Sequence, residues 1–268
     1  GAGAVSTGGT GGRGGGLAAA GQARGGEVTL GTRWVEPTLP GRQRAWTPVA
    51  RGAWERALRG GPVDVVSLAG RLVDVRRTRA NIASLRDSRV HATRTLVTAA
   101  RGSGVQVHRW LQASTTAIWG EAGEQRIDES TPLPEDVRAL EQMTGVARPW
   151  EEAAEDARAE RQHVLRTSIT WERDSPVFDR LAGLARSGLG GTVRDGRVWV
   201  SWLHLADWLR ITRLAPDAQD PGEHLAAPPL PAGPPVPAAP APVRNPALMP
   251  TLRRAVAPRT GGPRPPAP

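Results

Sequence analysis

Residues 7–16 constrain the fold of this chain more than any other stretch, because they read Thr-Gly-Gly-Thr-Gly-Gly-Arg-Gly-Gly-Gly. Gly8, Gly11 and Gly14 have the G-x-x-G-x-x-G spacing of a dinucleotide-binding turn. In such a turn the first glycine lets the chain leave a strand sharply. The second leaves room for a diphosphate, and the third lets the following helix lie close to the sheet. A flexible linker is the other interpretation of this run, because the chain contains 32 glycines, and both stay open at this point.

Short strand-like runs alternate along the chain with longer helical patterns, which is typical of a parallel sheet covered by helices. The predicted strands cover residues 27–30, 63–68, 107–113 (ending at Ser114) and 163–167. The predicted helices cover residues 79–100 and 149–161. The sequence therefore predicts an α/β fold, a Rossmann-like doubly wound parallel sheet with a small C-terminal substrate lobe and a Pro-rich tail.

Three regions follow from the change in pattern along the chain. Residues 1–170 form the expected NAD(P)-binding Rossmann-like domain, and residues 171–225 form a smaller region that completes the sheet and contributes the substrate lobe. Residues 226–268 are rich in proline and alanine, which predicts a linker and tail with a short helix near 246–256.

Composition limits the classes of partner. The chain has 268 residues and no lysine, so its 35 basic residues are all arginine and its formal net charge is +9. These arginines are spread along the chain among 26 acidic residues, which argues against nucleic acid as a partner. Five dispersed histidines and no cysteine give no metal signature. The sequence shows no membrane span and no signal region, so we expect a cytoplasmic protein.

Eight short segments in order carry a family resemblance. They comprise 7–20, 64–70, 87–93, 112–120, 150–153, 165–167, 188–191 and 201–207. This series resembles the atypical short-chain dehydrogenase/reductase family described as NAD-dependent epimerase/dehydratase-like, some of whose members carry a cell-division-inhibitor label. The resemblance runs from about Thr7 to Ala227.

The resemblance implies a nicotinamide cofactor across the carboxyl edge of the sheet. Gly8, Gly11 and Gly14 would hold its diphosphate. Arg33 would meet a 2′-phosphate just beyond the second strand, which favours NADP, with NAD as the alternative. One more solvated arginine in an arginine-rich chain is the other interpretation of Arg33.

The same resemblance places two loops beside the cofactor. Leu68, Ala69 and Gly70 would pass under the adenosine and the nicotinamide ribose, although an ordinary strand-ending turn also explains them. Ser114 and Thr115 lie where the superfamily places the hydroxyl that binds a substrate oxygen. Both would be catalytic residues in this interpretation, and helix or turn caps in the other.

Two further segments have structural alternatives. His204 is a candidate for lining the substrate cleft, with a core or capping role as the alternative, and Asp207 is expected to cap the next helix. Arg89 is expected to pair with a carboxylate, either Glu129 or Asp87.

The chain also departs from the family pattern. The superfamily uses a Tyr and a Lys four residues later for proton exchange. This chain has neither residue type, and Gln142 and Val146 fall near those positions. Gly12, Gly15 and Gly16 each cost the first helix about 1 kcal/mol relative to alanine, which predicts a frayed helix and weak cofactor affinity.

Two functions from different classes follow. The first is an NADP-binding epimerase or oxidoreductase that acts on an unidentified small molecule, with His204, Glu129 or water as the general acid. The second is a non-catalytic cofactor-binding module for regulation or interaction. A homodimer is a further assembly to test, because related folds dimerise through two helices.

Overall fold

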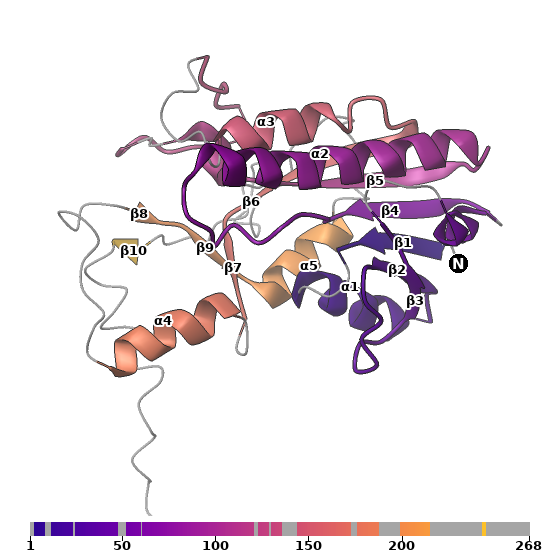
Figure 1. Cartoon of the computed structure of the whole chain (residues 1–268), viewed down its shortest axis with the longest axis horizontal. Coiled ribbons are helices and arrows are strands. Elements are labelled where there is room, and N and C mark those ends of the chain that lie inside the picture. Colours follow the sequence, from indigo (N-terminus) through magenta and orange to yellow (C-terminus); the bar gives the residue numbers. More distant parts are fainter. Residues whose placement is uncertain are drawn as a thin grey trace, which may run out of the picture.

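A parallel sheet forms the centre of the molecule (Figure 1). The computed structural model describes residues 3–8, 12–23, 25–47, 52–59, 61–120, 123–128, 130–135, 144–172, 176–187, 199–214 and 243–244. The sheet has six strands in the order β3-β2-β1-β4-β5-β6, and every neighbouring pair is parallel. This order reverses between β1 and β4, which is the topological switch point of a Rossmann fold. The predicted fold class is therefore confirmed.

The elements follow one another as strand and helix along most of the chain. The six strands of the sheet are β1 (Gly3–Thr7), β2 (Val28–Thr32), β3 (Arg42–Ala45), β4 (Val63–Ser67), β5 (Val107–Thr115) and β6 (Ala159–Thr167). The α-helices are α1 (Gly12–Gln22), α2 (Arg79–Gly102), α3 (Thr144–Glu152), α4 (Pro176–Arg186) and α5 (Leu205–Leu214). Two 3₁₀ helices, η1 (Ala53–Leu58) and η2 (Thr116–Trp119), follow β3 and β5.

Four short strands lie outside the central sheet. They are β7 (Ile169–Trp171), β8 (Trp199–Val200), β9 (Trp202–His204) and β10 (Val243–Arg244). Strand β7 pairs in parallel with β9, and β8 pairs with β10 in antiparallel fashion. An ion pair between Asp74, which follows β4, and Arg180 of α4 links this region to the sheet's loops.

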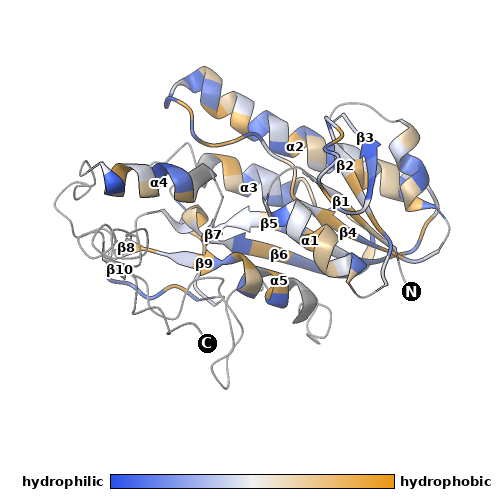
Figure 2. Ribbon diagram, turned by 90° about the horizontal axis from the view of Figure 1, so that it is seen from below, coloured by the Kyte–Doolittle hydropathy of each residue, from blue (hydrophilic) through white to orange (hydrophobic). Residues whose placement is uncertain are grey.

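Helices cover both faces of the sheet. Helices α2 and α3 lie on one face, and α1 and α5 lie on the other (Figure 1). Val65 packs in the cluster with Leu96 of α2, whereas its neighbour Val66 packs with Trp208 of α5. Because successive side chains of a strand point to opposite faces, a strand buried on both faces must be apolar at consecutive positions. Figure 2 shows this as orange along β4.

Helix α2 confirms the prediction for residues 79–100. The side chain of Thr78 accepts a hydrogen bond of 3.2 Å from the Asn81 amide, which caps the first turn. Leu85, Leu96 and Ala99 are fully buried, at the spacing that places apolar residues on one helix face. Gly104 then takes a φ of +66°, which ends the segment in a turn.

The prediction of a helix over 149–161 is wrong. Helix α3 begins at Thr144, ends at Glu152 and contains Pro149, while strand β6 already begins at Ala159. The content of Ala, Glu and Arg after Pro149 suggested a helix, but these residues form the end of α3, the following turns and the start of β6. Tight turns, with hydrogen bonds from the Ala154 amide to Glu151 and from the Ala157 amide to Ala154, connect α3 to β6.

Candidate functional site

Hydroxyl side chains line the carboxyl edge of the central strands. β1, β4, β5 and β6 end at Thr7, Ser67, Thr115 and Thr167. Thr167 Oγ accepts a hydrogen bond of 3.3 Å from the indole of Trp208, and Ser67 Oγ lies 3.4 Å from Thr93 Oγ. In an open α/β sheet, ligands bind outside this edge at the switch point. The edge between β1 and β4 is therefore the candidate site.

The turn after β1 needs a glycine at its first position. Gly8 has a φ of +81°, and a Cβ atom there would lie 2.9 Å from the carbonyl oxygen of Leu68. The Leu68 amide donates to the Thr7 carbonyl at 3.2 Å, so the loop after β4 lies directly against this turn. Any larger residue would push Leu68 and Ala69 away. The structure thus brings together Gly8, Leu68 and Ala69 of the predicted cofactor site.

The glycines inside α1 have packing roles that the sequence analysis did not recognise. Gly14 and Gly15 are buried, and a Cβ atom on Gly15 would lie 2.8 Å from Leu39 Cδ2. A Cβ atom on Gly16 would lie 3.4 Å from the side chains of Leu205 and Leu209 of α5. Helix α5 therefore packs against α1 at Gly16 with room for a methyl group, and the segment is helical from Gly12 onward. Gly11 lies outside the described residues.

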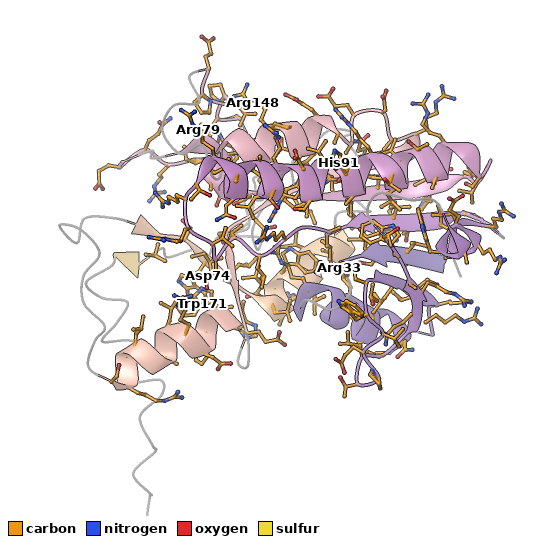
Figure 3. All side chains as sticks on the ribbon, viewed as in Figure 1. Arg33, Asp74, Arg79, His91, Arg148 and Trp171 are labelled. Atoms are coloured by element: carbon orange, nitrogen blue, oxygen red, sulfur yellow. The ribbon has the colours of Figure 1, made fainter. Side chains whose placement is uncertain are left out.

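Arg33 directly follows strand β2 and is exposed (Figure 3). Its neighbour Trp34 leaves 78% of its surface open to solvent, which is unusual for so large an apolar side chain. Thr32 fixes the local backbone, because its hydroxyl donates to the carbonyl of Trp34. The role of Arg33 toward a 2′-phosphate stays a prediction.

Ser114 is the centre of a buried polar cluster. Its hydroxyl donates a hydrogen bond to Glu151 Oε1, from α3. Arg166 of β6 holds both oxygens of the same carboxylate, with 3.0 Å from Nε to Oε1 and 2.9 Å from Nη2 to Oε2. The Arg166 guanidinium also lies 5.0 Å from the ring centre of Trp119. Glu151 therefore accepts hydrogen bonds from both Ser114 and Arg166, and the three side chains form one connected polar cluster.

Thr115 has a different position from its neighbour Ser114. Its hydroxyl accepts a hydrogen bond of 3.2 Å from the Ala117 amide and caps η2. This is the capping alternative for Thr115, and its catalytic role stays a prediction.

Val146, near the position where the superfamily has its lysine, is buried in α3, and Gln142, near the tyrosine position, lies outside the described residues.

The expectations for Arg89 and Asp207 need correction. Asp87 pairs with Arg86 at 3.1 Å instead of with Arg89, whose guanidinium donates to the carbonyls of Leu85 and Arg71 at 3.0 Å each. Arg89 thus binds backbone oxygens of α2 itself and of the loop between β4 and α2, and not the side chain of Asp87. Glu129, the other expected partner, lies outside the described residues.

Asp207 does not cap α5, because the helix already begins at Leu205. His204 caps it instead, with its Nδ1 accepting a hydrogen bond of 3.1 Å from the Ala206 amide. His204 is exposed, and its role in lining a substrate cleft stays a prediction.

Arg13 and Arg89 place positive charge at the same edge. Burial lowers the pKa of the Arg13 guanidinium. Burial, with a smaller contribution from the charge of Arg13, lowers the pKa of Arg89 to about 10. Both side chains remain charged at neutral pH. Sequence analysis missed Arg13 as a site residue, although its place between Gly11 and Gly14 was a signal.

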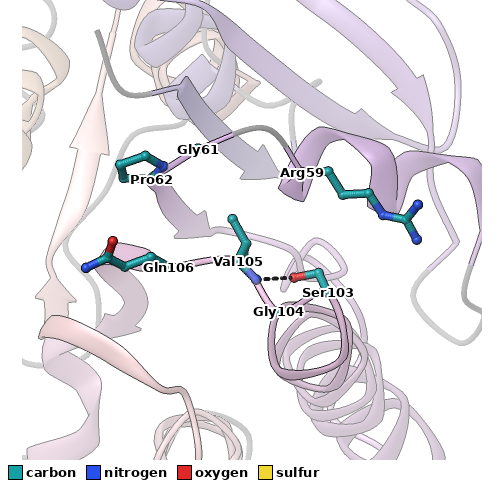
Figure 4. A pocket seen from close by; sticks show the side chains of 7 residues that line it. All are labelled: Arg59, Gly61, Pro62, Ser103, Gly104, Val105 and Gln106. Atoms are coloured by element: carbon teal, nitrogen blue, oxygen red, sulfur yellow. Dashed lines mark hydrogen bonds between the residues drawn. The ribbon is translucent and has the colours of Figure 1, made fainter.

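An open pocket of about 410 Å³ lies at the opposite edge of the sheet, where β4 and β5 begin (Figure 4). It is lined by Arg59, Gly61, Pro62, Ser103, Gly104, Val105 and Gln106. Apart from Arg59, these residues bring no ionisable side chain, so the pocket lacks groups that could act as an acid, a base or a nucleophile.

None of the helices in the described part of the chain has the length and apolar character that a membrane span requires.

Comparison with known proteins assigns the family. Residues 4–139, about half of the chain, match the NAD dependent epimerase/dehydratase family. The chain belongs to this family. An epimerase family protein of Mycobacterium bovis is 29% identical over 195 residues, which are 72% of this chain and 59% of that protein. The chain thus spans about six-tenths of the length of this curated family member.

Solved structures of the family share the fold. The nucleoside-diphosphate sugar epimerase of Corynebacterium glutamicum is 27% identical, with a TM-score of 0.73 over 93% of this chain and 49% of that one. The human epimerase family protein SDR39U1, solved with NADPH, is 23% identical, with a TM-score of 0.71 over 93% of this chain and 79% of that one. At this identity the human protein supports the fold alone.

Proposed function

We propose that this protein binds NADP at the edge between β1 and β4, with NAD as the alternative, and acts as an epimerase or oxidoreductase on a small molecule. The observation that carries the proposal is the turn at Gly8, whose positive φ and contact with Leu68 leave no room for a side chain. A turn of this kind at the switch point fits a dinucleotide. The human relative solved with NADPH, and Arg33 after β2, favour NADP.

When bound, the nicotinamide supplies a hydride acceptor or donor. Gly8 and the start of α1 would hold the diphosphate, and Leu68, Ala69 and Gly70 would lie beside the cofactor. The substrate oxygen would bind Ser114, whose own proton already points to Glu151. As the substrate carbon gives up a hydride and its O–H bond breaks, Ser114 would take the hydroxyl proton and pass its own to Glu151, in place of the missing Tyr and Lys. Arg166 supplies the countercharge throughout.

Cofactor binding is the first test. Purified protein titrated with NADPH should increase the fluorescence of the nucleotide until it saturates, and NADH should bind more weakly. The absence of saturable binding at millimolar NADPH would refute the proposal.

Catalysis is the second test. The relative from Corynebacterium glutamicum suggests nucleoside-diphosphate sugars as the first substrates to try. Conversion is followed by NMR of the sugar, and Ser114→Ala should remove it. Arg94→Leu is the control, since Arg94 is exposed on α2.

A non-catalytic cofactor-binding module is the second candidate. It is favoured by the hydrogen bond that commits the Ser114 proton to Glu151, together with the absence of any Tyr or Lys from the sequence. Saturable NADPH binding without conversion of any sugar tested would support this candidate over the enzyme.

A further inference from the structure

Two arginines from opposite faces of the sheet approach each other at the switch point. Arg13 lies in the first turn of α1, and Arg89 lies in α2. These helices cover opposite faces of the sheet (Figure 1). The turn at Gly8, just before α1, lies against Leu68 and Ala69, and Gly70 of the same loop lies against the Arg89 guanidinium, so both arginines stand where the turn after β1 meets the loop after β4. The lowering of the pKa of Arg89 by the charge of Arg13 agrees with this placement.

The Arg89 guanidinium is held in a fixed position. It donates to the carbonyls of Leu85 and Arg71 and lies 5.0 Å from the ring centre of Trp150. A Cβ atom on Gly70 would lie 2.9 Å from Arg89 Cζ, so the glycine makes space for this side chain. All of these partners are neutral. They orient the guanidinium without balancing its charge.

The Arg13 guanidinium lies 5.9 Å from the ring centre of Trp208. Trp208 is fully buried, and its indole N–H is already used by Thr167. Within the part of the chain that the structure describes, neither Arg13 nor Arg89 forms an ion pair with a carboxylate. Two like charges therefore share the edge without a counterion from these residues, which is unfavourable in a half-buried place.

One carboxylate, that of Glu172, lies near the start of α1. A Cβ atom on Gly12 would lie 2.9 Å from Glu172 Oε2, so the Glu172 side chain lies at the start of α1. The free N–H groups of a helix start attract an anion. An incoming anion would have to share this place with the Glu172 carboxylate.

We propose that Arg13 and Arg89 form a guanidinium pair that binds the diphosphate of the cofactor from both faces of the sheet, and that Glu172 competes with it at the start of α1. This inference rests on the proposed function. A diphosphate carries at least two negative charges and can accept hydrogen bonds from both guanidinium groups. It would compensate both charges at once.

The test uses inorganic diphosphate as the probe and isothermal titration calorimetry of the full chain as the measurement. Arg13→Leu should weaken diphosphate binding by at least about tenfold. Glu172→Gln should strengthen it several-fold, because the competing charge is gone while the shape is kept. Arg94→Leu removes the same charge from the exposed surface of α2 and should change the affinity less than about twofold.

The variants separate the inference from the proposed function. If the natural protein binds diphosphate through Arg13 but does not bind NADPH, the inference stands and the proposed function fails. If NADPH binds and Arg13→Leu has no effect on NADPH or on diphosphate, the guanidinium pair is refuted and the proposed function stands. Far-UV circular dichroism checks the fold of Arg13→Leu. Should that variant not fold, unchanged diphosphate affinity in Glu172→Gln would overturn the proposal.

Discussion

Ser114 and Arg166 face each other across the neighbouring strands β5 and β6, and both side chains bind the carboxylate of Glu151. The strand register places the serine and the arginine side by side, and α3 brings the carboxylate from outside the sheet. The Arg166 and Glu151 side chains are only 6% and 12% exposed, so little water screens their charges. We therefore expect this buried cluster to contribute to the stability of the protein.

Breaking this ion pair should be costly. Glu151→Leu leaves the Arg166 guanidinium buried without its counterion, and we expect the free energy of unfolding to fall by about 3–5 kcal/mol. Urea denaturation at pH 7 measures this change. The double variant Glu151→Leu/Arg166→Met should recover most of the loss. Glu27→Gln, in the exposed pair with Arg42, should cost at most about 1 kcal/mol. Equal losses in the single variants Glu151→Leu and Glu27→Gln would contradict this account.

Gly8→Ala should destabilise the protein by at least about 2 kcal/mol, since it adds a clash with Leu68 to the strain of a positive φ. Gly25→Ala is the matched control, because Gly25 has a φ of +72° with no atom within 4 Å of its Cβ position. This control should lose only about 1 kcal/mol. Urea denaturation compares both variants, and a similar loss in the two would show that the contact with Leu68 is unimportant.

Arg33→Leu should change the affinity for NADPH but not the affinity for NADH. If Arg33 binds a 2′-phosphate, the variant loses at least about tenfold in NADPH affinity and keeps its affinity for NADH. Fluorescence titration with each nucleotide measures both. A parallel loss for NADPH and NADH would assign Arg33 a general role instead of 2′-phosphate recognition.

Gly16→Ala should stabilise the protein by about 0.5–1 kcal/mol, because alanine favours the helix and the added methyl group meets Leu205 and Leu209 at ordinary contact distance. Gly21→Ala in the same helix should destabilise it, since its Cβ position is 2.3 Å from Val28 Cγ2. Thermal unfolding midpoints of the two variants should move in opposite directions.

The turn at Asp128 should lose stability as the pH falls. Hydrogen bonds from the side chains of Ser130 and Thr131 lower the pKa of this carboxyl. Its contribution to stability is therefore present above the model-peptide value of 3.8 and is lost as the pH falls through the lower pKa of the folded state. The Trp119 indole N–H, which donates to the Thr131 carbonyl at 3.2 Å, reports the change by NMR. Asp128→Asn should remove the pH dependence of that resonance.

The sequence predicted β2, β4 and β5 from their apolar residues and clear ends. Strand β6 was predicted only from His163, because its first residues, Ala-Glu-Arg-Gln, have no apolar pattern. Strand β4 and helix α2 lie within two residues of their predicted bounds. Strand β3 was not predicted, because Arg-Gln-Arg-Ala has no apolar alternation and lies at the sheet edge.

The site was harder to predict than the sheet. The segments with Glu151 and Arg166 were recognised as motifs, but their meeting with Ser114 depends on strand register and on where α3 packs. The position of Arg13 opposite Arg89 depends on tertiary packing across the sheet, which local sequence patterns do not encode.

The packing of α5 against Gly16 also indicates how much of the chain is needed for independent folding. Residues 4–139 match the family, yet β6 and α5 follow that stretch in the chain. A fragment that ended at residue 139 would lack Arg166 beside Ser114 and would leave the face of α1 at Gly16 without Leu205 and Leu209. We therefore expect the part of the chain that folds independently to include α5, beyond the end of the family match at residue 139.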